Sequence, residues 1–265
     1  MKILITGAHG FVGNRLMQDL DDTVAAPSMR SMSEEQIRNM IEKSRADVII
    51  HTAAISDVGT CEKNPGASYE ANVRLPLFLA KAAKEQKLIC FSSDQVYRGC
   101  AGEGPYKEED ASPCNVYGRH KLEMEQKVLD VKPDAVMLRA EWMYDYPTKR
   151  SNYLRMLLNE KQVLTFGKQY RGITYLREVA ENMPKIFMLP GGVYNFGSET
   201  KQTMYDITCE MLHFLKSDRK PEEVPPAHNL WMDCTKAKER GILFSDAKEG
   251  LKRCLKDYHL AKDRE

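Results

Sequence analysis

Residues 1–13 read MKILITGAHGFVG and set the interpretation of the rest of the chain. Residues 2–5 form a short apolar segment that runs directly into a glycine, which predicts a buried strand followed by a tight turn. Residues 10–21 carry apolar side chains at helical spacing. A strand, a glycine-rich turn and a helix in this order predict the first βαβ unit of a parallel sheet.

Glycines stand at positions 7, 10 and 13 of this loop. Gly7 permits the tight turn, Gly10 lets the backbone approach a pyrophosphate, and Gly13 lets the helix pack against the strand. The residues expected at the cofactor pyrophosphate are Gly7, His9, Gly10, Phe11, Val12 and Gly13. The alternative is a tight turn that binds no ligand. The position of the glycine loop directly after a first strand favours a dinucleotide site instead.

Short apolar segments alternate with amphipathic segments along the first half of the chain. Strands are predicted at residues 2–5, 23–26, 47–51, 88–92 and 135–138, and helices at 10–21, 34–44, 69–86 and 116–131. This rhythm predicts an α/β fold with a Rossmann-type, doubly wound parallel sheet. We expect an NAD(P)-binding domain over residues 1–140 and a smaller, partly interleaved substrate-binding lobe over residues 141–265.

The second half is less regular. Helices are predicted at residues 152–159, 176–188, 204–215 and 247–259, and a strand at 192–196. The polar, proline-rich segment 216–228, KSDRKPEEVPPAH, predicts a surface loop or a loop over a cleft.

The composition is that of an ordinary soluble globular protein. The 265 residues include 39 Lys or Arg and 38 Asp or Glu, a formal net charge of +1. This balance gives no support to nucleic-acid or polybasic membrane binding. No segment reaches the roughly 18 apolar residues of a membrane span, and the apolar start is too short for a signal peptide. A homodimer is compatible with the sequence, which contains no feature that determines the oligomeric state.

The seven cysteines are scattered and form no CxxC pair, and the six histidines show neither HxH nor HxxxH spacing. Zinc-ribbon and thioredoxin-type sites therefore lack support. We expect reduced thiols, a cytoplasmic location and no metal site.

Tyr117 and Lys121 are four residues apart in a predicted helix and share one face of it. A nearby ammonium and a bound nicotinamide lower the pKa of a tyrosine hydroxyl, which can then exchange a proton with a carbonyl or alcohol oxygen. Ser93 follows a predicted strand and should lie on the same ligand-binding edge of the sheet. The alternative is an exposed tyrosine beside an ion-paired lysine, and the glycine loop in the same chain favours catalysis.

The loop after the second predicted strand bears on the choice of dinucleotide. NAD sites usually place an acidic residue there, on the ribose hydroxyls. Residues 24–30, VAAPSMR, contain none, while Ser28 and Arg30 could contact a 2′-phosphate. These residues favour NADP, with NAD as the alternative. A solvated loop with an incidental arginine is the other interpretation.

Further segments resemble an extended short-chain dehydrogenase/reductase. They are TGAHGFVG (6–13), DVIIHTAA (47–54), CEKNP (61–65), YEAN (69–72), SSDQVY (92–97), NVYGRHK (115–121) and MLRAEWMY (137–144). Within that superfamily the chain most resembles dTDP-4-dehydrorhamnose reductases and the sugar-nucleotide-binding family around them, from residue 1 to about residue 258. The resemblance implies NAD(P)H-dependent reduction of a 4-keto-6-deoxy sugar carried on a nucleotide.

The resemblance also implies roles for matching residues. Ser93, Tyr117 and Lys121 match the catalytic set. The strand end that passes the cofactor riboses matches His51, Thr52, Ala53 and Ala54, and a helix asparagine that supports neighbouring strand ends matches Asn72. The expected sugar contacts are Ser56, Asp94, Gln95 and Trp142. For Trp142, simple packing between the lobes is the alternative.

Two departures from the family pattern leave the substrate open. The chain looks short after Trp142 and near its C-terminus, and Gln95 stands where an aromatic residue is usual. An epimerase or dehydratase with tightly held NAD is therefore one alternative. A non-catalytic dinucleotide-binding regulatory subunit, similar to that of methionine adenosyltransferase, is another.

Overall fold

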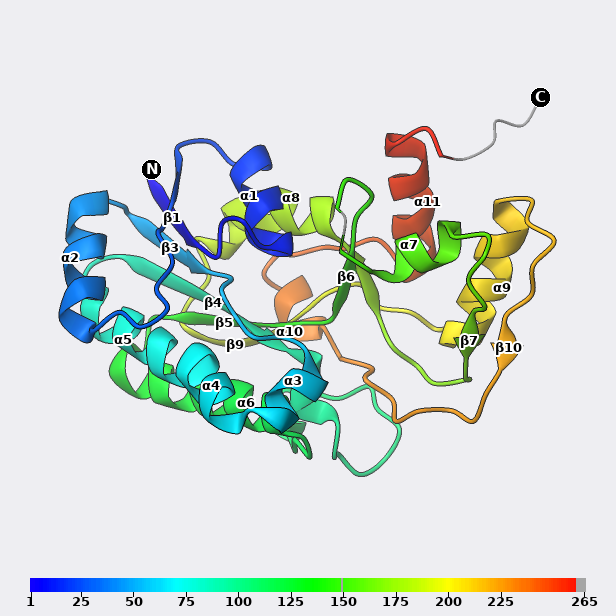
Figure 1. Ribbon diagram of the computed structural model, residues 1–265, viewed down its shortest axis with the longest axis horizontal. Coiled ribbons are helices and arrows are strands. Elements are labelled where there is room, and N and C mark those ends of the chain that lie inside the picture. The colour runs from blue at the N-terminus through cyan, green and yellow to red at the C-terminus, as the bar shows by residue number, and fades with distance from the viewer. Residues whose placement is uncertain (149, 261–265) are drawn as a thin grey trace.

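The centre of the protein is a parallel β-sheet (Figure 1). The computed structural model describes residues 1–148 and 150–260. Six strands lie in the order β2-β1-β3-β4-β5-β9, and every neighbouring pair is parallel. Their bounds are β1 Ile3–Thr6, β2 Thr23–Ala25, β3 Val48–His51, β4 Lys87–Ser93, β5 Val136–Ala140 and β9 Gly192–Phe196. The predicted α/β class with a Rossmann-type sheet is confirmed.

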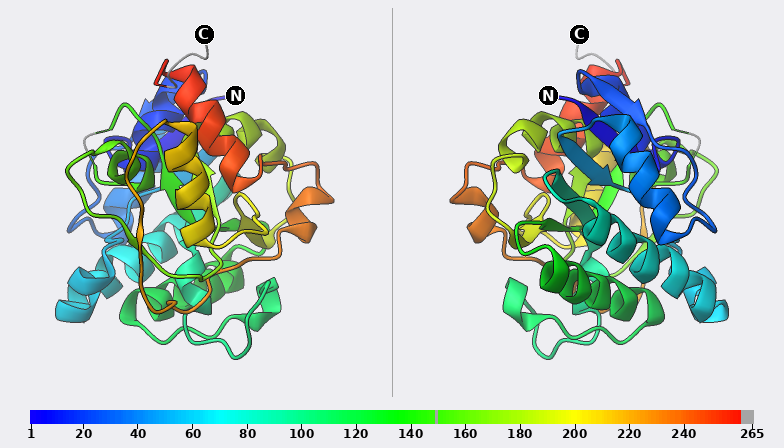
Figure 2. Two further views of the ribbon diagram at one scale, coloured as in Figure 1. Left: turned by 90° about the vertical axis from the view of Figure 1, so that its right-hand side faces the viewer. Right: turned by 90° about the vertical axis from the view of Figure 1, so that its left-hand side faces the viewer.

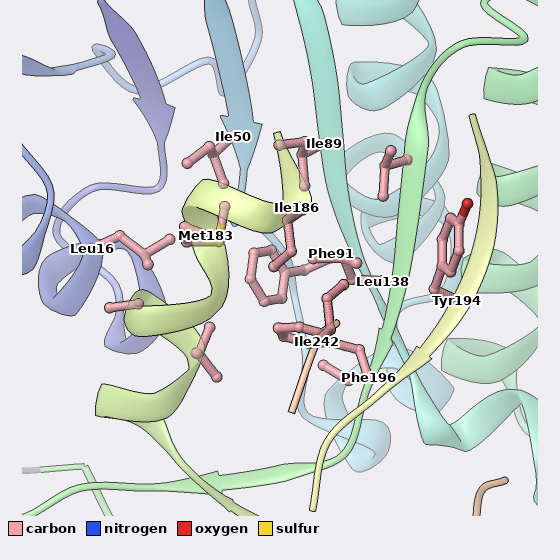
Figure 3. Close-up of a cluster of buried hydrophobic side chains, with 14 of the residues drawn as sticks. Leu16, Ile50, Ile89, Phe91, Leu138, Met183, Ile186, Tyr194, Phe196 and Ile242 are labelled. Carbon is pink, nitrogen blue, oxygen red and sulfur yellow. The ribbon is translucent and has the colours of Figure 1, made fainter. Parts of the chain in front are cut away.

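Helices cover both faces of the sheet (Figure 1, Figure 2). One face packs against α1 (Phe11–Asp19) and α8 (Leu176–Ile186), and the other packs against α2 (Glu34–Ser44), α5 (Leu75–Ala82) and α6 (Val116–Val131). Successive strand residues point to opposite faces, so continuous apolar strands supply both cores. In the first core, Leu16 of α1 and Met183 of α8 pack with Ile50 (Figure 3).

A smaller group of elements lies beside the carboxyl ends of the strands, on the right in Figure 1. Its helices are α7 (Tyr153–Leu158), α9 (Met204–Phe214) and α11 (Ala247–Asp257). Two short sheets accompany them, β6 (Trp142–Tyr144) with β8 (Ile173–Tyr175) and β7 (Thr165–Phe166) with β10 (Glu222–Glu223). All of these elements except the exposed β10 contribute to a third buried cluster.

Two of the predicted segments have a different structure. The helix expected at residues 69–86 is α4 (Pro65–Tyr69), a π-helical turn η1 (Glu70–Arg74) and α5, which ends at Ala82. Pro76 in the first turn of α5 lacks an N–H, which is consistent with this interruption. The expected loop at 216–228 contains β10.

Further short elements carried too weak a pattern to predict: β6, β7, β8, α3 (Val58–Lys63), α10 (Thr235–Lys238) and the 3₁₀ turns η2 (Asp94–Tyr97) and η3 (Glu108–Asp110). Across residues 1–148 and 150–260, no helix combines the length and apolar character needed to cross a membrane.

Candidate active site

The carboxyl ends of β1, β3, β4 and β5 border a cavity of about 660 Å³, hereafter the catalytic cavity. Ligands of parallel sheets bind at this edge. The predicted site residues in its wall are Gly7, Gly10, Phe11, Val12, Thr52, Ala53, Ala54, Ser56, Ser93, Asp94, Gln95, Tyr117, Lys121 and Trp142. The glycine loop and the Ser–Tyr–Lys set, which lie far apart in sequence, therefore meet in one cavity.

The glycine loop is too crowded for side chains. Gly7 has φ +73°, and a Cβ there would lie 2.7 Å from the Ala53 nitrogen. A Cβ on Gly13 would lie 2.3 Å from the Gly7 carbonyl oxygen. Helix α1 begins after Gly10 with no side-chain cap, so its first N–H groups remain available to an anion. This cradle fits the pyrophosphate of a dinucleotide.

Tyr117 and Lys121 project from the first turns of α6, which Asn115 caps by accepting a hydrogen bond from Gly118 N at 2.7 Å. Lys121 Nζ donates to the Phe91 carbonyl oxygen at 2.8 Å and lies 5.8 Å from the centre of the Tyr117 ring. Both side chains are buried. Ser93 ends β4, and its hydroxyl donates to Asp94 Oδ1 at 3.1 Å.

Burial controls the protonation of this pair. It raises the pKa of Tyr117 above its ordinary value, while Ser93 and Arg150 act in the opposite direction. Burial lowers the pKa of Lys121 to about 8. Burial therefore outweighs the lowering of the Tyr117 pKa that was expected from Lys121. A tyrosine in this state keeps its proton and can donate it.

Arg171 and Arg150 are cavity residues that the sequence analysis missed. Arg171 donates to Asp94 Oδ2 through Nε at 3.1 Å and Nη2 at 2.8 Å, and its guanidinium lies 5.3 Å from the centre of the Trp142 ring. Arg150 Nη2 donates to Ser56 Oγ at 2.9 Å. No pattern in the sequence assigned either arginine to the site, and the fold brings both to the sheet edge.

A second cavity of about 410 Å³ adjoins the first, since Gln95, Arg171 and Val58 line both. Its polar wall contains Gln95, Arg98, Asn115, Gln169, Arg171 and His228. Part of the segment predicted as a loop over a cleft, Ala227 and His228, borders it.

Other predicted cofactor residues lie outside the cavity wall. His9 is exposed, and Ser28 and Arg30 are exposed in the loop after β2. His51 is buried with Nδ1 2.7 Å from Thr6 Oγ1, and burial lowers its pKa to about 3, so the ring is neutral.

Asn72 also lies outside the wall, at the π-helical turn, and is fully buried. It holds the loop after β3 by accepting from Ile55 N at 3.2 Å and donating to Ile55 O at 2.9 Å. The part of the chain that the structure describes contains no group of three or more His, Cys, Asp or Glu side chains placed to hold a metal ion.

The six-stranded parallel sheet and the catalytic cavity at its carboxyl edge are those of an extended short-chain dehydrogenase/reductase fold. The chain belongs to the RmlD substrate binding domain family, whose family model matches residues 1–260. It is 28% identical over 243 residues to a dTDP-4-dehydrorhamnose reductase of Aggregatibacter actinomycetemcomitans, covering 84% of this chain and 82% of the relative. It is 27% identical to the mouse (Mus musculus) methionine adenosyltransferase 2 subunit beta, covering 91% of this chain and 83% of the relative.

Solved structures support the same fold. The crystal structure of dTDP-4-dehydrorhamnose reductase from Bacillus anthracis in complex with NADP superposes with a TM-score of 0.86. The match covers 97% of this chain and 99% of that chain at 22% sequence identity.

Proposed function

We propose that this protein is an NADPH-dependent reductase of a 4-keto-6-deoxy sugar linked to a nucleotide, of the kind named dTDP-4-dehydrorhamnose reductase among its relatives. The observation that carries this proposal is that Ser93, Tyr117 and Lys121 share one cavity with the glycine loop. The family membership of the whole chain supports it.

The residues expected to bind the cofactor fit a dinucleotide. The N-terminus of α1 binds the pyrophosphate, and Thr52, Ala53 and Ala54 pass the riboses. NADPH, when bound, supplies the hydride. Exposed Ser28 and Arg30 follow β2, where a guanidinium favours a 2′-phosphate. NADP is therefore the preferred form, with NAD as the weaker alternative.

The catalytic set handles the proton. Tyr117 gives its hydroxyl proton to the C4 oxygen of the sugar as negative charge develops there. The Ser93 hydroxyl donates a second hydrogen bond to that oxygen, which stabilises the charge. The Lys121 ammonium stabilises the tyrosinate that remains and holds the nicotinamide ribose. Burial keeps the donor protonated before the reaction.

The sugar nucleotide extends from the catalytic cavity into the second cavity. Ser56, Asp94, Gln95 and Trp142 border the sugar. Arg98 and Arg171 line the second cavity, and their guanidinium groups match phosphate oxygens in charge and geometry. This arrangement supports a nucleoside diphosphate carrier for the sugar.

Loss of NADPH absorbance in the presence of dTDP-4-dehydrorhamnose tests the proposal directly. We expect steady oxidation of NADPH and slower oxidation of NADH. Arg30→Ala should weaken NADPH binding about tenfold and leave NADH binding unchanged. Tight cofactor binding without turnover of this substrate or other nucleotide-linked keto sugars would contradict the reductase proposal.

A regulatory subunit is the second candidate, because the chain matches methionine adenosyltransferase 2 subunit beta over most of its length. This candidate predicts a stable complex with a methionine adenosyltransferase catalytic subunit in pull-down, without turnover. A same-class alternative, an epimerase or dehydratase, predicts NAD retained through purification and no net cofactor consumption.

We further propose a reducing, cytoplasmic location. The seven cysteines are free thiols, at positions 61, 90, 100, 114, 209, 234 and 254. Light scattering of the purified protein would test whether it forms the homodimer that the sequence leaves open.

A further inference from the structure

Glu141 is a carboxyl group in the wall of the catalytic cavity that the proposed proton transfer does not use. It directly follows β5, whose last residue, Ala140, pairs with Ser93 of β4. Only 7% of the residue is exposed. Sequence motifs did not single it out, because it is one residue within the segment MLRAEWMY.

One carboxyl oxygen of Glu141 is fixed by the protein and the other is not. Oε1 accepts a hydrogen bond from Thr174 Oγ1 at 2.5 Å. Thr174 Oγ1 in turn accepts from Ser198 N at 2.9 Å. Within residues 1–148 and 150–260, no side chain hydrogen-bonds or ion-pairs with Oε2, and the neighbouring Arg171 forms its ion pair with Asp94 instead.

Two glycines make room for this side chain. A Cβ on Gly172 would lie 1.9 Å from Glu141 Oε2, and a Cβ on Gly197 would lie 2.4 Å from Glu141 Cδ. Any larger residue at either position would displace the carboxyl group. The pocket around Glu141 is therefore shaped for a carboxyl, although that carboxyl has no cationic partner among the described residues.

We propose that Glu141 is a specificity-determining residue of the sugar pocket, in which Thr174 holds Oε1 and the Oε2–H group of the protonated carboxyl donates a hydrogen bond to a hydroxyl of the sugar. This inference rests on the proposed function, because it assigns the sugar to the cavity that Glu141 lines.

The chemistry of the site supports donation rather than acceptance. Burial raises the pKa of Glu141 to about 8, with Asp94 acting in the same direction and Thr174, the Ser198 backbone N–H and Arg171 acting against it. The other titratable group that it influences is the buried Cys234 thiol. A raised pKa means that the protonated donor dominates below about pH 8 and is lost above it. Apparent sugar affinity should therefore fall as the pH rises through that value.

The test compares Glu141→Gln with Glu141→Leu in the full chain. The glutamine keeps an acceptor for Thr174 and a donor for the sugar, whereas the leucine keeps only the volume. Glu141→Leu should raise KM for dTDP-4-dehydrorhamnose about tenfold with kcat and NADPH affinity little changed. Glu141→Gln should keep KM near the wild-type value and remove its rise above about pH 8. Lys121 also has a pKa of about 8, but it is present in the wild type and in both variants. Its contribution therefore cancels when the KM of each variant is divided by the wild-type KM at the same pH.

A binding measurement keeps the inference separate from the proposed reaction. Calorimetry with dTDP-rhamnose and with dTDP alone reports the sugar contacts without turnover. We expect Glu141→Leu to lose affinity for dTDP-rhamnose only. If the variant binds both compounds as the wild type does, or if wild-type affinity rises above about pH 8, the inference is wrong. Absence of NADPH oxidation with intact sugar-dependent binding would contradict the proposed reaction alone.

Discussion

Gly13 shows how a single absent side chain shapes the cofactor loop. Its Cα faces the Gly7 carbonyl, and a Cβ there would lie 2.3 Å from that oxygen. The replacement Gly13→Ala should therefore push the loop away from α1. We expect at least tenfold weaker NADPH binding and a loss of about 1–3 kcal/mol in the free energy of unfolding. Fluorescence titration and thermal unfolding would measure both.

Gly66 provides a matched control, because a Cβ at this position in α4 meets no atom within 4 Å. Gly66→Ala should leave NADPH binding unchanged. Equal effects of the two substitutions would show that the tight contact at Gly13 does not shape the cofactor site.

Residues whose positions follow from local spacing were predictable. Tyr117 and Lys121 share a helix face by their separation in sequence, and Ser93 ends an apolar strand, so the structure brings all three to one cavity. Glu141 and Arg171 were not predictable. Their positions depend on how the β5–β6 connection packs against the segment before β8. The spacing of apolar residues in the sequence does not indicate that contact.

At the scale of elements, Asn72 fastens the π-helical turn to the loop after β3 through both backbone groups of Ile55. Asn72→Ala would leave the partly buried Ile55 N–H without its partner, while Ile55 O would keep its contact with Cys61 Sγ, so we expect a cost of about 1 kcal/mol in unfolding free energy. We expect lower thermal stability and weaker NADPH binding, because Ala53 and Ala54 in the same loop line the cavity. Unchanged cofactor affinity in a destabilised variant would limit Asn72 to a structural role.

The long helices and buried strands of the first half were predicted closely, as α2 and α6 illustrate. Each of them carries apolar side chains at one regular spacing along its whole length. The interruption between α4 and α5 was not, since apolar spacing continues through it and only Pro76 hints at a break. The two-residue strands β7 and β10 are too short to carry any period. Their pairing depends on tertiary contacts.

At the scale of the whole molecule, Arg15 joins the first helix to the last elements of the chain. Its Nη1 donates to Asp145 Oδ2 at 3.0 Å, just after β6, and to the Tyr258 hydroxyl at 2.8 Å, just after α11. Arg15→Met leaves Asp145 buried without its cation, which costs about 3–5 kcal/mol in unfolding free energy. Chemical denaturation would measure the loss.

The pH dependence of this variant has a definite sign. Burial already raises the pKa of Asp145 and Arg15 lowers it, so removing Arg15 raises it further. The folded variant then binds a proton that the unfolded chain releases, and its stability falls as the pH rises from about 4 towards neutrality. Arg38→Met, which removes an exposed pair with Glu34, should cost little at any pH. A loss for Arg15→Met that does not grow with pH would contradict this account.

The sheet order of the molecule was only partly accessible from sequence. The predicted strand at 192–196 is observed with the same bounds, yet its place beside β5 as the sixth strand is a tertiary result. The catalytic cavity likewise combines the sheet edge with Trp142, Arg150 and Arg171 from later in the chain.

The central claim is that Tyr117 donates the proton in reduction of a nucleotide-linked keto sugar. The most direct measurement is kcat for NADPH oxidation with dTDP-4-dehydrorhamnose by Tyr117→Phe and by the control Tyr69→Phe, whose hydroxyl accepts from Lys127. We predict that Tyr117→Phe lowers kcat by roughly 10²–10⁴-fold with unchanged binding of NADPH and dTDP-rhamnose, and that Tyr69→Phe has no such effect. Wild-type turnover in Tyr117→Phe would contradict the account.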